Sequence, residues 1–413
     1  MIEPRRLLRP ATLTDAEMRR IQHLLPDQDP VLCDPPQEPG SPRHALHVCE
    51  PILDGNELLY VTECVRSNWV SSGGPFVTKF EEQFAALVGC EYGIACSSGT
   101  AALHLALAAQ GLGPGDEVII PTFTMIATAN AVSYTGARPI VVDAHEDDWN
   151  IDVTQIEAKV TPRTKCIVIV HTYGQPARMD VVHEIAQRHQ LTVIEDSAEA
   201  HGAEYRGRAV GSLGDAATFS FYGNKIVTTG EGGMVTTNDA TFAQLVRRLR
   251  DHAFSSDRHF WHEYLGFNYR MTNLQAALGL AQTERLSELV ERRRTLRAQY
   301  DASLKNVPGI SVPAEMPHTK SVSWMYTILV DEAAFGCSRD DLRRSLARRG
   351  IETRTLFIPI HLQPIYFHQF LSERFPIAER LCRLGLYLPS GPTMKEPEVE
   401  YVVQSIRHAA TGQ

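Results

Sequence analysis

The sequence predicts an α/β protein, with a largely parallel sheet in a large domain and a smaller α+β domain at the C-terminal end. Short runs rich in Val and Ile recur at 116–121, 137–143, 166–174 and 191–197, with helical stretches between them. Such runs are typical of strands buried on both faces, and their alternation with helices is typical of a parallel sheet. After about residue 285 the alternation stops.

The spacing of apolar residues predicts two helices before the first of these strands. In one of them, Val77, Phe80, Phe84 and Leu87 fall on a single helical face. The other begins after a Ser-Ser-Gly turn at 97–99, which is a good signal for a helix cap.

The C-terminal pattern predicts a different architecture. A long arginine-rich helix over 284–304 precedes a strand over 323–330. A further helix has Ser338 as its cap, Asp341 three residues later and Gly350 as its stop. We expect these elements to form the smaller α+β domain.

The N-terminal segment differs from the rest of the chain. Residues 12–25 predict a short amphipathic helix, with Met18, Ile21 and Leu25 at helical spacing. Six prolines follow within 26–44, which favours an extended arm. Two alternatives stay open: a poorly ordered tail, or an arm that lies over a partner subunit. The predicted division is therefore an N-terminal segment at 1–47, a large domain at 48–284 and a small domain at 285–413.

Composition argues against several classes of function. The net charge of -9 does not favour a nucleic-acid partner, because phosphate binding requires a basic surface. No apolar run approaches the ~18 residues of a membrane span, and the opening stretch has no apolar signal core, so neither a membrane nor export is expected. The eight cysteines are scattered without a C-x-x-C pair. This favours free thiols in a reducing compartment, and we expect the cytoplasm.

An acidic pair ends the last of the four predicted strands. Glu195 and Asp196 follow an apolar run, so they are expected at the carboxyl edge of the sheet, where parallel sheets bind ligands. A partly desolvated carboxylate needs a cationic or hydrogen-bonding partner. For Asp196 a protonated pyridine nitrogen is such a partner. A helix-capping role is the structural alternative.

Lysine is scarce, and one lysine is isolated. Only seven of the 40 basic residues are Lys, and Lys225 is the single lysine between Lys165 and Lys305. It follows another strand-like run, 29 residues after Asp196. A lysine that forms a Schiff base must lose its proton, which burial and a nearby cationic group favour. A surface lysine is the alternative when Lys225 is taken alone.

A third motif predicts a phosphate site. Ser98, Gly99 and Thr100 open a helix, where unpaired N–H groups and the helix dipole favour an anion. Ser220 lies five residues before Lys225 and adds a hydroxyl group. Together with the lysine and the acid, these residues predict a site for pyridoxal 5'-phosphate (PLP).

Longer stretches carry a resemblance to a known family. They are CSSGTAALHLAL, PGDEVIIPTFT, EDSAEAHGAEYRGRAVGSLGDAATFSFYGNKIVTTGEGGMVTTND, GFNYRMTNLQAALGLAQ and IETRTLFIPIHLQPIY. The chain, from about residue 48 to its C-terminal end, resembles the DegT/DnrJ/EryC1/StrS family of sugar-nucleotide aminotransferases. The resemblance implies the aspartate-aminotransferase fold (PLP fold type I), with a seven-stranded type of sheet in the large domain.

The resemblance also implies roles for individual residues. Lys225 would bond the cofactor as a Schiff base and then shuttle protons, and Asp196 would pair with the pyridine nitrogen. The backbone at Gly99 and Thr100, with the hydroxyl of Ser220, would hold the phosphate.

Asn268, within GFNYRM, would reach that phosphate from the neighbouring subunit. The resemblance thus implies a homodimer with shared active sites, or a dimer of such dimers. A loop-turn asparagine is the alternative for this residue in isolation.

Two positions depart from the common pattern of the family. Met125 stands where many relatives place an aromatic residue on the cofactor ring; a thioether can also cover a ring face. Glu199 stands where many have Gln or His near the ring oxygen, so its carboxylate would be protonated or turned toward substrate. The stretch around Glu199, with HFWHEYLGFNYRM, resembles the branch of the family that makes GDP-perosamine.

Other residues are candidates for binding the sugar nucleotide. Trp69, Ser71 and Ser72 lie on a glycine-flanked loop, and His361 lies between two prolines. For each of them a structural role is an equal alternative. His252, His259 and His262 fit no familiar zinc spacing, so no metal is expected.

The expected reaction moves an amino group from glutamate to a keto group of a nucleotide-linked hexose, at C4 of GDP-4-keto-6-deoxymannose. Relatives with histidine in place of the lysine dehydrate the sugar instead, so the presence of Lys225 favours transamination. A dTDP- or UDP-linked keto sugar, aminated at C3 or C4, is the alternative substrate. A PLP-binding homologue without turnover is the alternative of another class.

Overall fold

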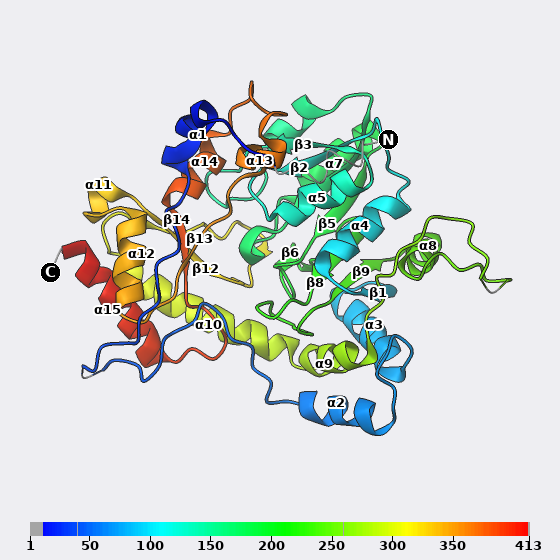
Figure 1. Ribbon diagram of the computed structural model, residues 1–413, viewed down its shortest axis with the longest axis horizontal. Helices are drawn as coiled ribbons and strands as arrows, with labels where there is room; N and C mark the ends of the chain where they lie inside the picture. The colour runs from blue at the N-terminus through cyan, green and yellow to red at the C-terminus, as the bar shows by residue number, and fades with distance from the viewer. Residues whose placement is uncertain (1–10, 39, 259, 412–413) are drawn as a thin grey trace.

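The computed structural model describes residues 11–38, 40–258 and 260–411, and its centre is one seven-stranded sheet (Figure 1). The strand order is β1-β9-β8-β5-β4-β2-β3. The five strands from β8 to β3 are parallel, whereas β9 runs antiparallel to both of its neighbours. The sheet is therefore largely parallel, as expected. Its strands are β1 (Tyr92–Cys96), β2 (Glu117–Pro121), β3 (Arg138–Val142), β4 (Thr164–Val170), β5 (Thr192–Asp196), β8 (Ala216–Ser220) and β9 (Gly233–Thr237).

Helices cover this sheet because their apolar faces need a partner. Helix α4 (Gly99–Ala109) is apolar and lies against β8 and β9, between α5 (Ile126–Tyr134) and α8 (Ala240–Arg250). Helix α3 (Pro75–Val88) packs on α9 (Asn273–Thr283) beside β1. Helix α7 (Met179–His189) contacts β5.

One detail of α3 differs from the expectation. Val77, Phe80 and Phe84 are buried as predicted, but Leu87 is 46% exposed and Val88 is buried in its place. In a helix with 3.6 residues per turn both residues lie beside the predicted face, so packing against neighbouring elements decides which of them is buried.

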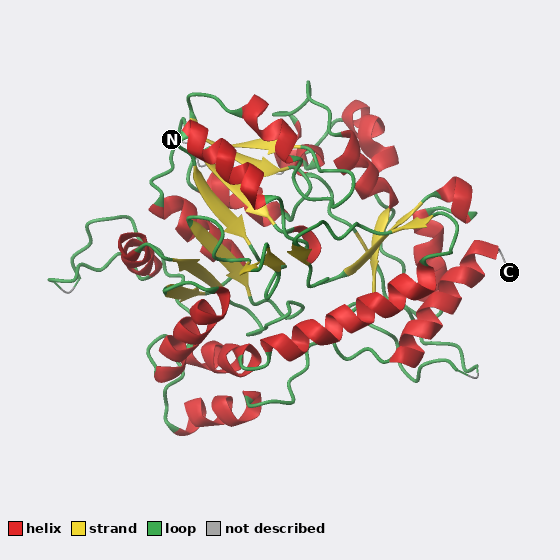
Figure 2. Ribbon diagram, turned by 180° about the vertical axis from the view of Figure 1, so that it is seen from behind, coloured by secondary structure: helices red, strands yellow, loops and turns green. Residues whose placement is uncertain are grey.

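A second apolar core lies in the C-terminal region, between the small sheet and the helices that Figure 2 shows beside it. It is built on an antiparallel sheet of order β10-β12-β14-β13, covered by α10 (Leu286–Leu304), α12 (Arg339–Arg348) and α15 (Glu396–Thr411). Helix α10 runs from the end of α9 to α15, so it spans both cores. Ser338 caps α12, as predicted. The strands are β10 (Ile310–Ser311), β12 (Tyr326–Val330), β13 (Arg354–Thr355) and β14 (Gly385–Leu388).

The remaining elements are short. A three-stranded sheet has the order β11-β6-β7, with β6 (Glu204–Tyr205), β7 (Arg208–Ala209) and β11 (Thr319–Lys320). The short helices are α2 (Glu57–Arg66), α6 (Val153–Ile156), α11 (Glu332–Phe335), α13 (Pro364–Phe367) and α14 (Pro376–Leu384), with 3-10 turns η2 (Glu157–Lys159), η3 (Thr172–Gly174) and η4 (Ile360–Leu362). Within the described ranges, none of the helices combines the length and hydropathy needed to cross a bilayer.

The apolar core of the large sheet also takes in side chains from beyond residue 285, among them Trp324, Leu356 and Phe370. The domain boundary at 284/285 stays a prediction, because residues beyond it also pack into the core of the large sheet.

The described part of the N-terminal segment is tied to this chain's own C-terminal region, which neither alternative for that segment anticipates. Helix α1 (Asp15–Ile21), with a Thr14 capping box, and the 3-10 turn η1 (Gln22–Leu24) lie next to α14 (Figure 1). Ile21 and Leu24 pack with Leu362 and Phe367. Residues 1–10 lie outside the described residues.

Polar contacts continue this attachment along α12. Asp29 pairs with the buried guanidinium of Arg343, and Asp27 with Arg344. Leu46 then forms a parallel bridge with Ile351. The segment thus follows the C-terminal region over its whole described length.

Replacing the buried Ile21 with Ala should lower the free energy of unfolding by at least about 2 kcal/mol, because it removes packing against Leu362 and Phe367. Met18→Ala in the same helix is the matched control. Its side chain is 37% exposed, so a change below about 0.5 kcal/mol is expected. Urea unfolding followed by circular dichroism measures both. Equal effects would contradict docking of α1 on its own chain.

Candidate active site

A cavity of about 390 Å³ opens beyond the carboxyl ends of the parallel strands. This is where the strand pattern predicted a ligand site. The cavity brings together residues that lie far apart in sequence: the start of α4, the ends of β5 and β8, and the loops that follow them. The predicted residues that line it are Ser98, Gly99, Thr100, Met125, Asp196, Glu199, Ser220 and Lys225.

The two acids at the end of β5 have opposite roles because successive strand residues point to opposite faces. Glu195 accepts N–H bonds from Gly211, Leu213 and Gly214, and its Oε2 lies 3.0 Å from His171 Nε2. Burial alone would raise the pKa of Glu195, but these bonds outweigh it and hold the pKa below its ordinary value. Glu195 is therefore a structural anion.

The tautomer of His171 follows from its second contact. The backbone N–H of Ala177 donates to His171 Nδ1 at 3.1 Å, so the ring proton is on Nε2 and points to Glu195. This buried pair of Glu195 and His171 holds β5 on the side opposite to Asp196.

Asp196 faces the cavity and is only 5% exposed. Its Oδ2 accepts a bond from the Thr128 hydroxyl at 2.8 Å, and its Oδ1 accepts from the Ala198 N–H at 3.3 Å. Burial raises the pKa of Asp196, and these bonds and the charge of Lys225 only partly oppose it. A buried carboxylate in this position is stabilised by a cationic ligand atom, which a protonated pyridine nitrogen provides.

The start of α4 is pressed against the end of β8. Ser98 caps the helix by accepting the Ala101 N–H at 3.1 Å. A Cβ atom on Gly99 would lie 2.6 Å from the Cβ of Ser220, and one on Gly233 would lie 2.3 Å from the Ser98 carbonyl oxygen. Only glycine permits this approach. It places helix N–H groups and the Ser220 hydroxyl in one concave cradle, which suits a phosphate.

Lys225 reaches into the same cavity, with its side chain 11% exposed. Its Nζ lies 3.9 Å from Glu199 Oε1 and 3.5 Å from the centre of the Trp324 ring. Burial lowers the pKa of Lys225, although the charges of Glu199 and Asp196 oppose the shift. A lower pKa leaves more of the amine unprotonated, as a nucleophile requires.

Glu199 is 4% exposed and lies beside this amine. Burial raises its pKa to about 7, against the charge of Lys225. The Tyr173 N–H donates to Oε2 at 2.7 Å and fixes the carboxyl group. A pKa of about 7 leaves part of the Glu199 population protonated at neutral pH, which reduces the repulsion that a carboxylate would exert on a phenolate.

These features fit PLP. Asp196 would hold the ring nitrogen, the cradle of α4 and Ser220 would hold the phosphate, and Lys225 would meet the aldehyde. Each of these assignments is a proposal that rests on the burial, the close approach at Gly99 and the position of the amine described above.

Comparisons with known proteins give the family of the chain. Residues 51–407 match the model of the DegT/DnrJ/EryC1/StrS aminotransferase family. The chain belongs to this family. The chain is similar to the GDP-perosamine synthases of Caulobacter vibrioides, at 47% identity over 87% of this chain and 97% of that protein, and of Escherichia coli O157:H7, at 44% over 87% and 97%.

Solved structures show the same fold. The S. venezuelae DesV structure has a TM-score of 0.80 at 38% identity, covering 86% of this chain and 94% of that chain. The structure of DesI with its TDP-sugar product has a TM-score of 0.84 at 33% identity, covering 91% and 95%. The aspartate-aminotransferase type of fold is confirmed, and the protein is a PLP-dependent sugar aminotransferase.

Five predicted site residues do not line the cavity of this chain. Trp69 and Ser71 are exposed, and their loop is held by Asn273, which donates to the Trp69 carbonyl and the Ser71 carbonyl; Ser72 lies in the same loop. Asn268 is exposed and bridges Asp251.

His361 has a local structural setting. Its Nδ1 lies 2.8 Å from the Thr122 hydroxyl and its Nε2 lies 3.4 Å from Glu379. The ring packs on Phe375, with 4.4 Å between ring centres. The substrate roles of Trp69, Ser71, Ser72 and His361, and the phosphate contact of Asn268 across a subunit interface, stay predictions. Met125 does line the cavity and is half exposed there, which leaves its thioether available to a ring.

Several cavity residues were missed from the sequence. Trp324, Arg354, Phe357 and Tyr387 come from the C-terminal region and close the cavity on one side. The spacing of these residues in the sequence does not indicate that they pack against the cavity at the edge of the large sheet. Arg354 and Phe357 do lie in the IETRTLFIPIH stretch, which was the available signal.

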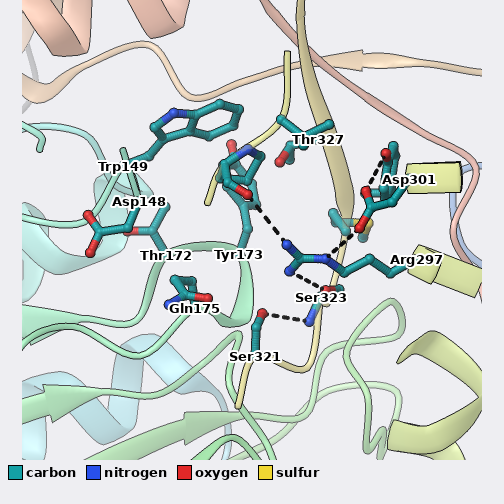
Figure 3. A pocket seen from close by; sticks show the side chains of 14 residues that line it. Asp148, Trp149, Thr172, Tyr173, Gln175, Arg297, Asp301, Ser321, Ser323 and Thr327 are labelled. Atoms are coloured by element: carbon teal, nitrogen blue, oxygen red, sulfur yellow. Dashed lines mark hydrogen bonds and ion pairs between the residues drawn. The ribbon is translucent and has the colours of Figure 1, made fainter. Parts of the chain in front are cut away.

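A second, smaller cavity of about 20 Å³ lies behind Tyr173 (Figure 3). In it, Arg297 donates to Ser323 Oγ and Asp301 Oδ2. Among the described residues no group of three or more His, Cys, Asp or Glu side chains could hold a metal; His259 lies outside them.

Gly99→Ala should weaken PLP binding by about tenfold or more, because the added methyl group must displace Ser220 and opens the phosphate cradle. Quenching of tryptophan fluorescence in the cofactor-free protein measures the Kd. Gly113→Ala is the control, since a Cβ there would meet nothing within 4 Å. An unchanged Kd for the Gly99 variant would contradict the cradle.

Proposed function

We propose that the protein transfers the amino group of glutamate to the C4 keto group of GDP-4-keto-6-deoxymannose and so makes GDP-perosamine. The observation that carries this proposal is the similarity, over almost their whole lengths, to two proteins named GDP-perosamine synthase. The buried amine and acid in one cavity provide the chemistry that such a reaction needs.

PLP, when bound, supplies an aldehyde that exchanges amines and a ring that withdraws electrons. In our proposal the Lys225 amine attaches PLP to the protein, and the same Nζ moves a proton to and from the reacting carbon. Asp196 keeps the ring nitrogen protonated. Glu199, with a pKa of about 7, can hold or release a proton beside Lys225. The aromatic wall formed by Trp324, Phe357 and Tyr387 limits the access of water.

Two alternatives have observations of their own. The chain is 39% identical to a dTDP-3-amino-3,4,6-trideoxy-alpha-D-glucose transaminase of Streptomyces venezuelae, which keeps a dTDP- or UDP-linked sugar as a second candidate substrate. It is 40% identical to a protein of Geobacillus stearothermophilus named pleiotropic regulatory protein. A binder without turnover would take up PLP, but glutamate would not bleach its visible absorption and a keto sugar would not restore it.

We also propose a homodimer with shared sites, or a dimer of such dimers. Helix α2 and the loop after it expose Leu58, Leu59, Trp69 and Val70, and exposed apolar patches of this kind mark interfaces. Asn268 is exposed on this chain and is not among the residues that line its own cavity, as a residue that serves a partner would be. The cytoplasm is the proposed location, because all eight cysteines are free and free thiols persist in reducing compartments.

Nucleotide choice is tested by thermal unfolding with GDP, UDP and dTDP. A ligand at a hundred times its Kd adds about 2.7 kcal/mol to the stability of the folded state. GDP should therefore raise Tm at concentrations where UDP and dTDP do not. Conversion of GDP-4-keto-6-deoxymannose with glutamate, followed by mass spectrometry of the product, completes the test. A larger shift with dTDP or UDP would overturn the GDP assignment.

Lys225→Ala should still bind PLP but lose turnover by at least about a hundredfold, because one residue supplies both the attaching amine and the proton carrier. Lys225→Arg keeps the charge and should fail equally. Steady-state rates and the visible absorption spectrum measure these effects.

Mixing Lys225→Ala with Asn268→Ala protein tests the shared site. Random reassembly makes half of the dimers hybrids with one intact site, so activity should rise to about a quarter of the normal value, above that of either variant. No recovery after subunit exchange would contradict a site built from two chains, whereas normal turnover by Lys225→Ala would contradict the function itself.

A further inference from the structure

Trp324 lies against the Lys225 nitrogen as part of the aromatic wall of the cavity. It lies in the loop before β12, at 5% exposure, and lines the cavity. Its ring centre is 3.5 Å from Lys225 Nζ, closer than the 3.9 Å from that nitrogen to Glu199. An ammonium over the face of an indole is attracted by the ring quadrupole, and tryptophan gives the strongest such contact.

The edge of the same ring holds the backbone beside the lysine. Trp324 Nε1 donates to the carbonyl oxygen of Asn224 at 2.7 Å. One side chain thus fixes both the residue before Lys225 and the end of the Lys225 side chain.

Two backbone hydrogen bonds link Trp324 to Glu199 through Tyr173. The backbone N–H of Trp324 donates to the Tyr173 carbonyl oxygen at 3.1 Å, and the backbone N–H of Tyr173 donates to Glu199 Oε2. The rings of Trp324 and Tyr173 are stacked with an interplanar angle of 16°, and the rings of Tyr173 and Phe357 with an angle of 9°. The two partners of the Lys225 nitrogen therefore share one rigid support.

The backbone before Trp324 is strained, which indicates that its direction is imposed. Ser323 has a φ of +47°, a left-handed conformation that costs energy in a residue other than glycine. Arg297 donates to Ser323 Oγ at 3.0 Å, and Ser321 Oγ accepts the Ser323 N–H at 3.1 Å (Figure 3). These bonds hold the turn that aims the indole at Lys225.

We propose that Trp324 is a positioning residue for amino transfer: its ring face holds the Lys225 nitrogen whenever that nitrogen is not bonded to the cofactor, and its N–H fixes the adjoining backbone. The proposal rests on the proposed role of Lys225. A free lysine side chain has several rotamers, and Glu199, 3.9 Å away, is a competing partner for the amine. The indole offers attraction without a competing proton acceptor.

The test uses fluorinated tryptophan at position 324, which keeps the shape and the N–H while it weakens the ring face. In cofactor-free protein, the pH dependence of amine labelling at Lys225 is read by mass spectrometry, with the other six lysines as internal standards. Loss of ring attraction disfavours the ammonium, so the labelling midpoint should move to lower pH with each added fluorine. The groups that also face the amine, and that stay unchanged, are Asp196, Glu199, His201 and Cys49.

Turnover should fall as the number of fluorine atoms on the ring increases. We expect kcat to fall by about tenfold or more at the highest fluorination, while KM for both substrates changes by less than about threefold, since the ring acts through the lysine. Trp324→Phe, which keeps a ring, should retain more activity than Trp324→Leu. Fluorinated tryptophan at the exposed Trp261 is the control.

A pH midpoint of labelling that does not change with fluorination would overturn the proposal. A midpoint that changes while kcat stays constant would overturn it as well. Both outcomes are separate from failure of the proposed function. Labelling needs neither cofactor nor substrate, and a wrong function would show as absent turnover in the unmodified protein.

Discussion

The site depends on keeping a carboxylate and an amine out of water at one edge of a sheet. Asp196 and Lys225 are both largely buried, and burial of ionisable groups is unfavourable unless they have partners. Thr128 and the Ala198 N–H donate hydrogen bonds to the Asp196 carboxylate. The Lys225 amine has Glu199 and the Trp324 ring as its partners. In our proposal the protonated ring nitrogen of the cofactor supplies the positive charge that Asp196 still lacks.

This arrangement requires a rigid frame behind it. The buried pair of Glu195 and His171 fixes β5 from the side away from the cavity, so that Asp196 keeps its direction. The contact of Gly99 with Ser220 brings α4 to the end of β8. A parallel sheet makes this possible because the ends of neighbouring strands and the starts of following helices meet at one edge.

The C-terminal region completes the site, although it contributes no strand to the large sheet. Trp324, Phe357 and Tyr387 close the cavity from that side. The N-terminal segment reinforces the same region, because Ile21 and Leu24 pack on the residues around η4 and α13. Helix α1 therefore packs on the segment that follows Phe357 in the sequence.

The sequence alone determined the parallel sheet and its buried strands, because short apolar runs and the residues at their ends are local properties. The expected roles of Lys225 and Asp196 came from these positions together with the family resemblance. It also indicated the phosphate turn at Ser98 to Thr100. It did not determine that Trp324 faces Lys225, since this contact joins positions about 100 residues apart and depends on a strained turn that Arg297 holds. The register of the α3 stripe at Val88 and the attachment of the N-terminal segment were likewise decided by packing, in which many distant side chains compete for the same surface.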